Sequence, residues 1–276
     1  MKTNLKRNIE LKETAKASLS GHSGVNEGGK LVKTLPVTMK ELEVIQTPQE
    51  TKFWHPVAHS DVPKTIIEMV NKNGWKMVGT GEDRFQMIKT ETDTKLFGIC
   101  KIVIPGNTDP DYQLALGFRN SFDKTLALRF AVGASVFVCS NLMLSGDIII
   151  NEIHNSKIDP VDMVRRIFEM IPGAAKRLTD WMAGLREIKI TEDEGMGYLV
   201  AAVEAEALPI FSLMDARQKF LLAYNGENPE IQYGKTVWSV YNAITEQWKK
   251  HLLSNVQPRS EKLNELVSAR TGLEVI

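Results

Sequence analysis

The feature that most constrains the fold is a change in hydrophobic period near residue 155. After Asp159 and Pro160, apolar side chains recur at alternating spacings of three and four residues, at Val161, Val164, Phe168, Ile171, Ala175, Leu178, Met182 and Leu185. An aspartate followed by proline is typical of a helix start. The spacing therefore predicts one long helix whose apolar stripe packs on another layer. Pro172 interrupts this stripe and predicts a kink.

Upstream of this helix the chain has strand character. Segments rich in apolar and β-branched residues are separated by glycine, proline, aspartate and asparagine turn signals, at 75–78, 84–89, 95–104, 113–118 and 126–139. Short connections between consecutive strands favour an antiparallel meander, and Gly98 suggests a bulge within it. A short helix capped by Asp61 should precede the strands.

The C-terminal third again reads as helical, with helices at 208–224 and 235–253 and a last one from Ser260. We therefore predict an α+β fold, in which an antiparallel strand meander is packed by a long kinked helix and followed by a helical C-terminal third. Residues 51–190 would form the α+β core and residues 191–276 a mainly helical part packed on it.

The first fifty residues differ in composition from the rest. Residues 1–34 carry seven lysines and arginines against three acids, and the stretch 18–30 is rich in glycine and serine. We interpret residues 1–50 as a flexible basic N-terminal arm, with ordered structure beginning near Phe53. Such an arm is either a frayed terminus or a contact for a polyanion or a partner subunit.

Composition excludes several classes of function. The 276 residues contain 34 basic and 34 acidic side chains, so no global field attracts DNA or an anionic membrane. No apolar run approaches the roughly 20 residues of a membrane span. Two cysteines cannot form a disulfide framework. We expect a cytoplasmic protein that does not associate with membranes.

Nucleotide-binding motifs fail by position, and no cofactor is expected. The Gly234-Lys235-Thr236 triplet would need a glycine where Pro229 stands to complete a P-loop. A dinucleotide-binding loop starting at Gly79 would need its third glycine where Arg84 stands.

Two enzymatic readings rest on residue type alone, and we assign no catalytic or metal-binding residue. His55 and His59 with Asp61 could hold zinc, although exposed loop histidines are the simpler reading. Cys139 and His154 could form a thiol site, although Cys139 ends an apolar strand. The acidic run 192–194 reads as a solvated turn.

The most informative segment is 117–125, Gly-Phe-Arg-Asn-Ser-Phe-Asp-Lys-Thr, which lies between two apolar strands. Its polar side chains either close a hairpin or contribute to a basic surface. A sheet crossed by a long helix, with basic groups lining the junction, could follow a phosphate backbone. The candidate nucleic-acid-binding residues are Arg119, Lys124, Arg129, Arg166 and Arg177, with Phe122 as an exposed aromatic that could stack on a base.

The segment 118–125, together with 131–133, 136–142 and Ser145-Gly146, resembles the core of a phage- and plasmid-borne family, domain of unknown function 932. The Trp-His-Pro-Val-Ala-His run at 54–59 and the segment 237–246 fit the same pattern. The resemblance implies a phage or mobile-element protein in a bacterial cytoplasm and gives no reaction. A strand meander followed by a long helix is also similar in layout to phage single-strand annealing proteins.

Two functional hypotheses follow, and neither requires catalysis. The first is a homo-oligomeric protein that binds or anneals single-stranded DNA during recombination or replication. The second is an interaction module that binds and inhibits a host protein, for which the neutral charge and the Trp238, Tyr241 and Trp248 spacing are suitable, although such aromatics are more often core residues. Convergence of Arg119, Arg129, Arg166 and Arg177 on one exposed face would favour the first.

Overall fold

The computed structural model describes residues 24–27, 30–105, 112–136, 141–227, 234–248 and 253–274. Its strands are β1 (Gly24–Glu27), β2 (Lys30–Pro36), β3 (Lys76–Met77), β4 (Phe85–Thr90), β5 (Lys95–Val103), β6 (Tyr112–Ser121), β7 (Leu128–Val136) and β8 (Asn141–Glu152). They form one sheet in the order β1-β2-β4-β5-β6-β7-β8, with β3 paired to β5, and the strand pairs are antiparallel.

Helices α2 (Met39–Glu43) and α3 (Asp61–Lys72) precede most of the sheet, and α4 (Pro160–Glu187) follows it. The C-terminal part contains α5 (Glu192–Glu204), α6 (Leu213–Tyr224), α7 (Val237–Gln247) and α8 (Leu253–Thr271); short 3-10 turns lie at Gly81–Arg84 and Ile210–Ser212. The predicted α+β fold with a strand meander, a long helix and a helical C-terminal region is therefore confirmed. Among the described helices, none is both long enough and apolar enough to cross a bilayer.

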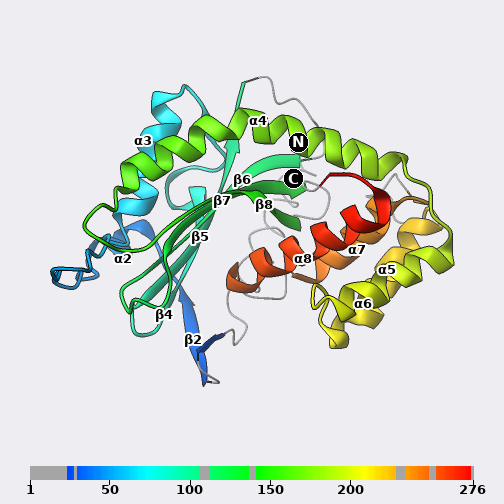
Figure 1. Cartoon of the computed structure of the whole chain (residues 1–276), viewed down its shortest axis with the longest axis horizontal. Helices are drawn as coiled ribbons and strands as arrows, with labels where there is room; N and C mark the ends of the chain where they lie inside the picture. Colours follow the sequence, from blue (N-terminus) through cyan, green and yellow to red (C-terminus); the bar gives the residue numbers. More distant parts are fainter. Residues whose placement is uncertain are drawn as a thin grey trace, which may run out of the picture.

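The long helix begins where the sequence predicts. The Asp159 carboxylate accepts hydrogen bonds from the backbone N–H groups of Val161 and Asp162, and Pro160 occupies the first turn. Pro172 lies inside the helix, which arches over the sheet in Figure 1. The predicted stripe is buried except at its first position, since Val161 is exposed. The buried face is also wider than the stripe and includes Ile167 and Trp181.

Helices α4 and α8 cover opposite faces of the sheet (Figure 1). Leu128 on β7 opposes Glu152 on β8, and Glu152 binds Arg166 of α4, so this side of the sheet is the α4 face. The next residue along β7, Arg129, points to the other side and binds Glu261 of α8. We call this second side the α8 face; it also carries Phe97 and Arg119, the residues in register with Arg129 on β5 and β6.

Regular structure begins earlier than expected. Strand β2 pairs with β4, and α2 starts with a capping box between Thr38 and Glu41, so the expectation that order starts near Phe53 is wrong. The division of the chain at residues 50 and 190 stays a prediction. Strand β8 was also not predicted, because its run from Asn141 contains a serine and a glycine and does not alternate.

Two local interpretations are corrected. Gly98 is not a bulge: the β4–β5 and β5–β6 registers run through it without a shift, and the irregularity lies between Ala131 and Gly133 on β7. The Phe118 ring occupies the space above Gly98. The acidic run after Thr191 is the first turn of α5, because Thr191 and Glu194 form a capping box.

Candidate nucleic-acid interface

The segments that carry the family resemblance meet at the buried side chain of Asn120, at the end of β6. Its Nδ2 donates to the Val57 carbonyl (2.7 Å) and to His59 Nδ1 (3.0 Å). Its Oδ1 accepts from His154 Nε2 (2.7 Å) and from the Ser121 backbone N–H (3.0 Å). All four hydrogen-bonding positions of the amide are used, so Asn120 joins the loop before α3 to β6 and to the end of β8.

Both histidines of this network are held neutral. Burial lowers the pKa of His59 to about 4, and the hydrogen bond from its Nε2 to the Asp93 carbonyl (3.1 Å) only partly opposes this. Burial also lowers the pKa of His154. His59 Nδ1 accepts from the Asn120 amide and His154 Nε2 donates to it, and a neutral imidazole ring can make either contact. The cluster is therefore a structural network in which these hydrogen bonds are satisfied.

The geometry does not support the hypothesis of a zinc site at His55, His59 and Asp61. His59 is buried, contrary to the expectation of two exposed loop histidines, while His55 pairs with Glu50 at 2.9 Å. No three histidine, cysteine or carboxylate side chains in the described ranges are grouped to hold a metal ion. Cys139 lies outside the described residues, and His154 is committed to Asn120.

The turn after β6 places Phe122 and Lys124 against the same loop. The Phe122 ring stacks on His59, with ring centroids 3.8 Å apart, so one of its faces is covered. The Lys124 ammonium lies 4.8 Å from the Trp54 ring centroid and is exposed to solvent. Lys124 has a positive φ of 65°, which this turn imposes on a non-glycine residue. Stacking of Phe122 on a base is thus limited to its remaining surface.

Arg119 and Arg129 lie side by side on the α8 face of the sheet. They are directly opposed on β6 and β7, and each is partly buried. Arg129 Nη2 donates to Glu261 Oε1 (2.9 Å), and these side chains are only 21% and 30% exposed. Burial and the neighbouring Arg129 lower the pKa of Arg119, and Glu261 counteracts this. Arginine stays charged despite such a shift, so this pair keeps two positive charges close together.

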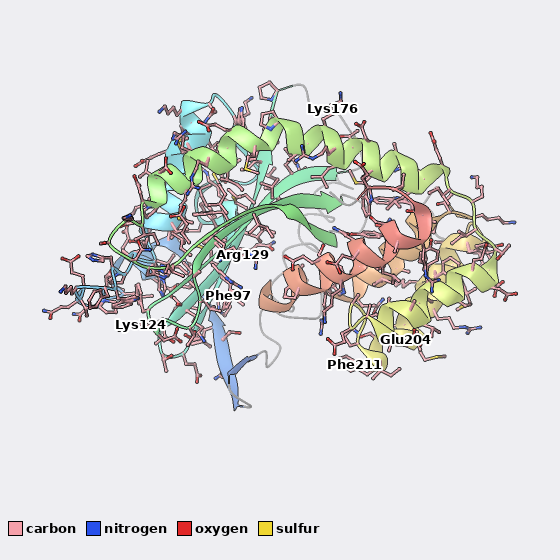
Figure 2. All side chains as sticks on the ribbon, in the orientation of Figure 1. Phe97, Lys124, Arg129, Lys176, Glu204 and Phe211 are labelled. Carbon is pink, nitrogen blue, oxygen red and sulfur yellow. The ribbon has the colours of Figure 1, made fainter. Side chains whose placement is uncertain are left out.

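The arginines of α4 lie elsewhere. Arg166 binds Glu152 and also Asp162, whose Oδ2 is 2.9 Å from its Nε, while Arg177 is exposed. Figure 2 shows Lys176, the neighbour of Arg177, on the outer side of α4, whereas Arg129 and Phe97 lie on the sheet strands. Arg119, Arg129, Arg166 and Arg177 therefore do not converge on one exposed face.

Sequence reasoning missed two residues of this region. Glu261 is 132 positions from Arg129, and no local pattern links the two. Asn120 was read as a turn former, and only the register of β6 and the fold of residues 54–59 reveal its central position. The Trp238, Tyr241 and Trp248 side chains are buried in the core of the C-terminal part, so they provide no docking surface.

The fold and these clusters define an α+β protein with a structural Asn-His network and a partly buried arginine pair. Residues 50–270 match the family described as domain of unknown function (DUF932), and the chain belongs to this family. No curated protein and no solved structure shows significant similarity to the chain.

Proposed function

We propose that the protein binds single-stranded nucleic acid without catalysis, and that the strand contacts the α8 face of the sheet. The observation that carries this proposal is the cross-strand pair of Arg119 and Arg129; in the described part of the chain, the Glu261 carboxylate pairs with Arg129 and its charge also acts on Arg119. Like charges held in adjacent positions are destabilising unless an anion lies between them. Glu261 makes its ion pair with Arg129, so an anion that contacts Arg119 would add a favourable charge interaction.

The chemistry of the pair favours a phosphate ligand. A guanidinium group presents a planar fork of donors that matches the oxygens of phosphate. Arg119 Nε is buried and makes no hydrogen bond within the described part of the chain. A flexible single strand can present one phosphate at a time to side chains that are only partly exposed, whereas a rigid duplex requires a more open surface.

The remaining candidate residues differ in how available their side chains are to a phosphate group. Lys124 is exposed in the turn that follows β6 and could extend the phosphate path from Arg119. Arg166 is already engaged by two carboxylates, and Arg177 lies on α4. We therefore assign binding to Arg119, Arg129 and Lys124. Phe122 stacks on His59, which Asn120 binds from the α4 face, so we do not assign it to this surface. Strand annealing by a homo-oligomer in a bacterial cytoplasm, during recombination of a mobile element, is the process this activity would fit.

The test is fluorescence anisotropy of labelled single- and double-stranded oligonucleotides across a salt series. Single strands should bind more tightly, and binding should weaken steeply as salt rises. Arg119→Ala and Arg129→Ala should each weaken binding and lower the magnitude of the salt slope by about 1. Arg177→Ala is the matched control, because it removes the same charge from an exposed position on α4, and it should bind like the wild type. No binding at low salt refutes the proposal.

An apolar surface patch favours host-protein inhibition as the second candidate. Ile210, Phe211 and Met214 are between 66% and 76% exposed at the start of α6. Figure 2 shows Phe211 at the edge of the C-terminal helices, well away from Arg129. Clustered exposed apolar side chains commonly mark protein interaction sites. A host protein retained by the wild type and lost with Phe211→Ser, but kept with Val44→Ser at another exposed position, would support this candidate.

A further inference from the structure

We propose that Glu261 is an intramolecular occupant of the phosphate position at Arg129, so that a nucleic-acid strand must displace this carboxylate in order to bind. This inference rests on the proposed function. It assigns α8 a regulatory role at the same site: the carboxylate competes with phosphate and lowers the affinity of the resting protein for short or weakly bound strands.

The Glu261 carboxylate is chemically equivalent to a phosphate group at this position. A carboxylate oxygen 2.9 Å from Arg129 Nη2 makes the charge-assisted hydrogen bond that a phosphate oxygen would make. The Glu261 charge also acts on Arg119, whose pKa it raises against the effects of burial and of Arg129. One acidic side chain therefore compensates both arginines, as a bound phosphate would.

Helix α8 can release this contact without leaving the sheet. Leu263 and Val267 are fully buried in the core, and Asn264 Oδ1 accepts a 2.7 Å hydrogen bond from the Tyr241 hydroxyl. These contacts, on the turns that follow Glu261, hold the helix backbone. Glu261 itself is 30% exposed, so rotation of its side chain toward solvent is sufficient for the exchange.

The contact is also weak enough to be exchanged. An ion pair with both partners partly open to solvent contributes little net stability, because solvent screens the charges and ordering the side chains costs entropy. A strand that neutralises both arginines gains counterion release and a second guanidinium contact in return. Phosphate should therefore displace Glu261 rather than be excluded by it.

The experiment compares Glu261→Gln with Glu265→Gln in the same anisotropy assay on full-length protein. Both variants remove one negative charge from α8, but Glu265 is exposed and lies one turn further along the helix. Glu261→Gln should tighten binding of a single-stranded oligonucleotide about fivefold, from the loss of a competing charge-assisted hydrogen bond. Glu265→Gln should change it by less than about twofold.

A double variant tests whether the tighter binding of Glu261→Gln depends on Arg129. In an Arg129→Ala background, Glu261→Gln should give less tightening than in the wild-type background, because the guanidinium group that binds the carboxylate is gone and only its effect on Arg119 remains. Circular dichroism of each variant confirms that α8 and the sheet remain folded.

The possible results separate the two proposals. Wild-type binding with no selective gain in Glu261→Gln overturns the role of Glu261 and leaves the proposed function standing. Absence of binding by the wild type and by Glu261→Gln overturns both. Binding by Glu261→Gln alone overturns the proposed function of the wild-type protein, because it means that the carboxylate excludes the strand instead of being displaced by it.

Discussion

Lowering the pH from about 7.5 to about 5 should destabilise the fold through the histidines around Asn120. His59 Nδ1 accepts a hydrogen bond from the Asn120 amide, and its Nε2 faces the Asp93 carbonyl. Protonation of Nδ1 would place two donors against each other at 3.0 Å in a site that is 1% exposed, and the charge of Asp93 only partly offsets the effect of burial on the pKa of His59. The charged form is therefore strongly disfavoured in the folded protein.

The direction and size of the change in the free energy of unfolding follow from the linkage between proton binding and folding. The pKa of His59 is about 4 in the folded protein and 6.5 in an unfolded chain. Between these values the unfolded state binds more protons, so stability is complete above about pH 6.5 and is lost as the pH falls toward about 4. His59 alone should lower the free energy of unfolding by about 2 kcal/mol between pH 7.5 and 5. His154 shifts in the same direction and adds to this loss.

The assay is urea unfolding followed by tryptophan fluorescence at a series of pH values across this window. Carboxylates whose pKa is depressed, such as Asp123 and Glu206, begin to protonate at lower pH, so the upper part of the window reports on histidine. The double variant His59→Gln, His154→Gln should be less stable at neutral pH and have a flatter pH profile. A wild-type free energy of unfolding that is constant within about 0.5 kcal/mol from pH 6.5 to 5 would refute the reasoning.

Two further predictions concern packing of the sheet. Asn120→Ala leaves several buried polar partners without a hydrogen bond and should lower the free energy of unfolding by about 3 to 5 kcal/mol, while the exposed Asn73→Ala should cost less than about 1 kcal/mol, both measured by urea unfolding. Gly98→Ala places a Cβ 2.2 Å from the Phe118 ring and should cost about 1 to 3 kcal/mol, measured as a lower midpoint in the same assay. An Asn120→Ala midpoint equal to that of Asn73→Ala, or a Gly98→Ala midpoint equal to wild type, contradicts the corresponding contact.

The elements with strong local signals could be predicted from the sequence. The helix behind Asp159 and Pro160 was predictable because an N-cap, a first-turn proline and a sustained apolar period coincide there. The predicted strands correspond to β3, β4, β5, β6 and β7, since turn residues separate these apolar segments from one another. The start of α5 at Thr191 was missed although its capping box is visible in the sequence, because the acidic run was read only for its charge.

The candidate site was much less predictable, because its charges are balanced by long-range contacts. Arg166 was a candidate nucleic-acid-binding residue, yet Glu152 from β8 reaches it across the helix–sheet junction. Arg129 is balanced by Glu261, which depends on how α8 crosses the sheet. Helical and strand periodicity place a side chain on a face but carry no information about which acidic side chain the fold brings opposite to it.

Strand geometry connects the two clusters at the end of β6. Asn120 and Arg119 are consecutive, so their side chains point to opposite faces of the sheet. Four hydrogen bonds at Asn120 fix the position of β6 on the α4 face, and this fixes Arg119 against Arg129 on the α8 face. The residues that carry the family resemblance here thus act as scaffold, and the arginine they orient is the one we expect to meet the ligand. In an Asn120 variant that still folds, a loosened β6 should weaken single-strand binding through Arg119 while leaving the charge of the surface unchanged.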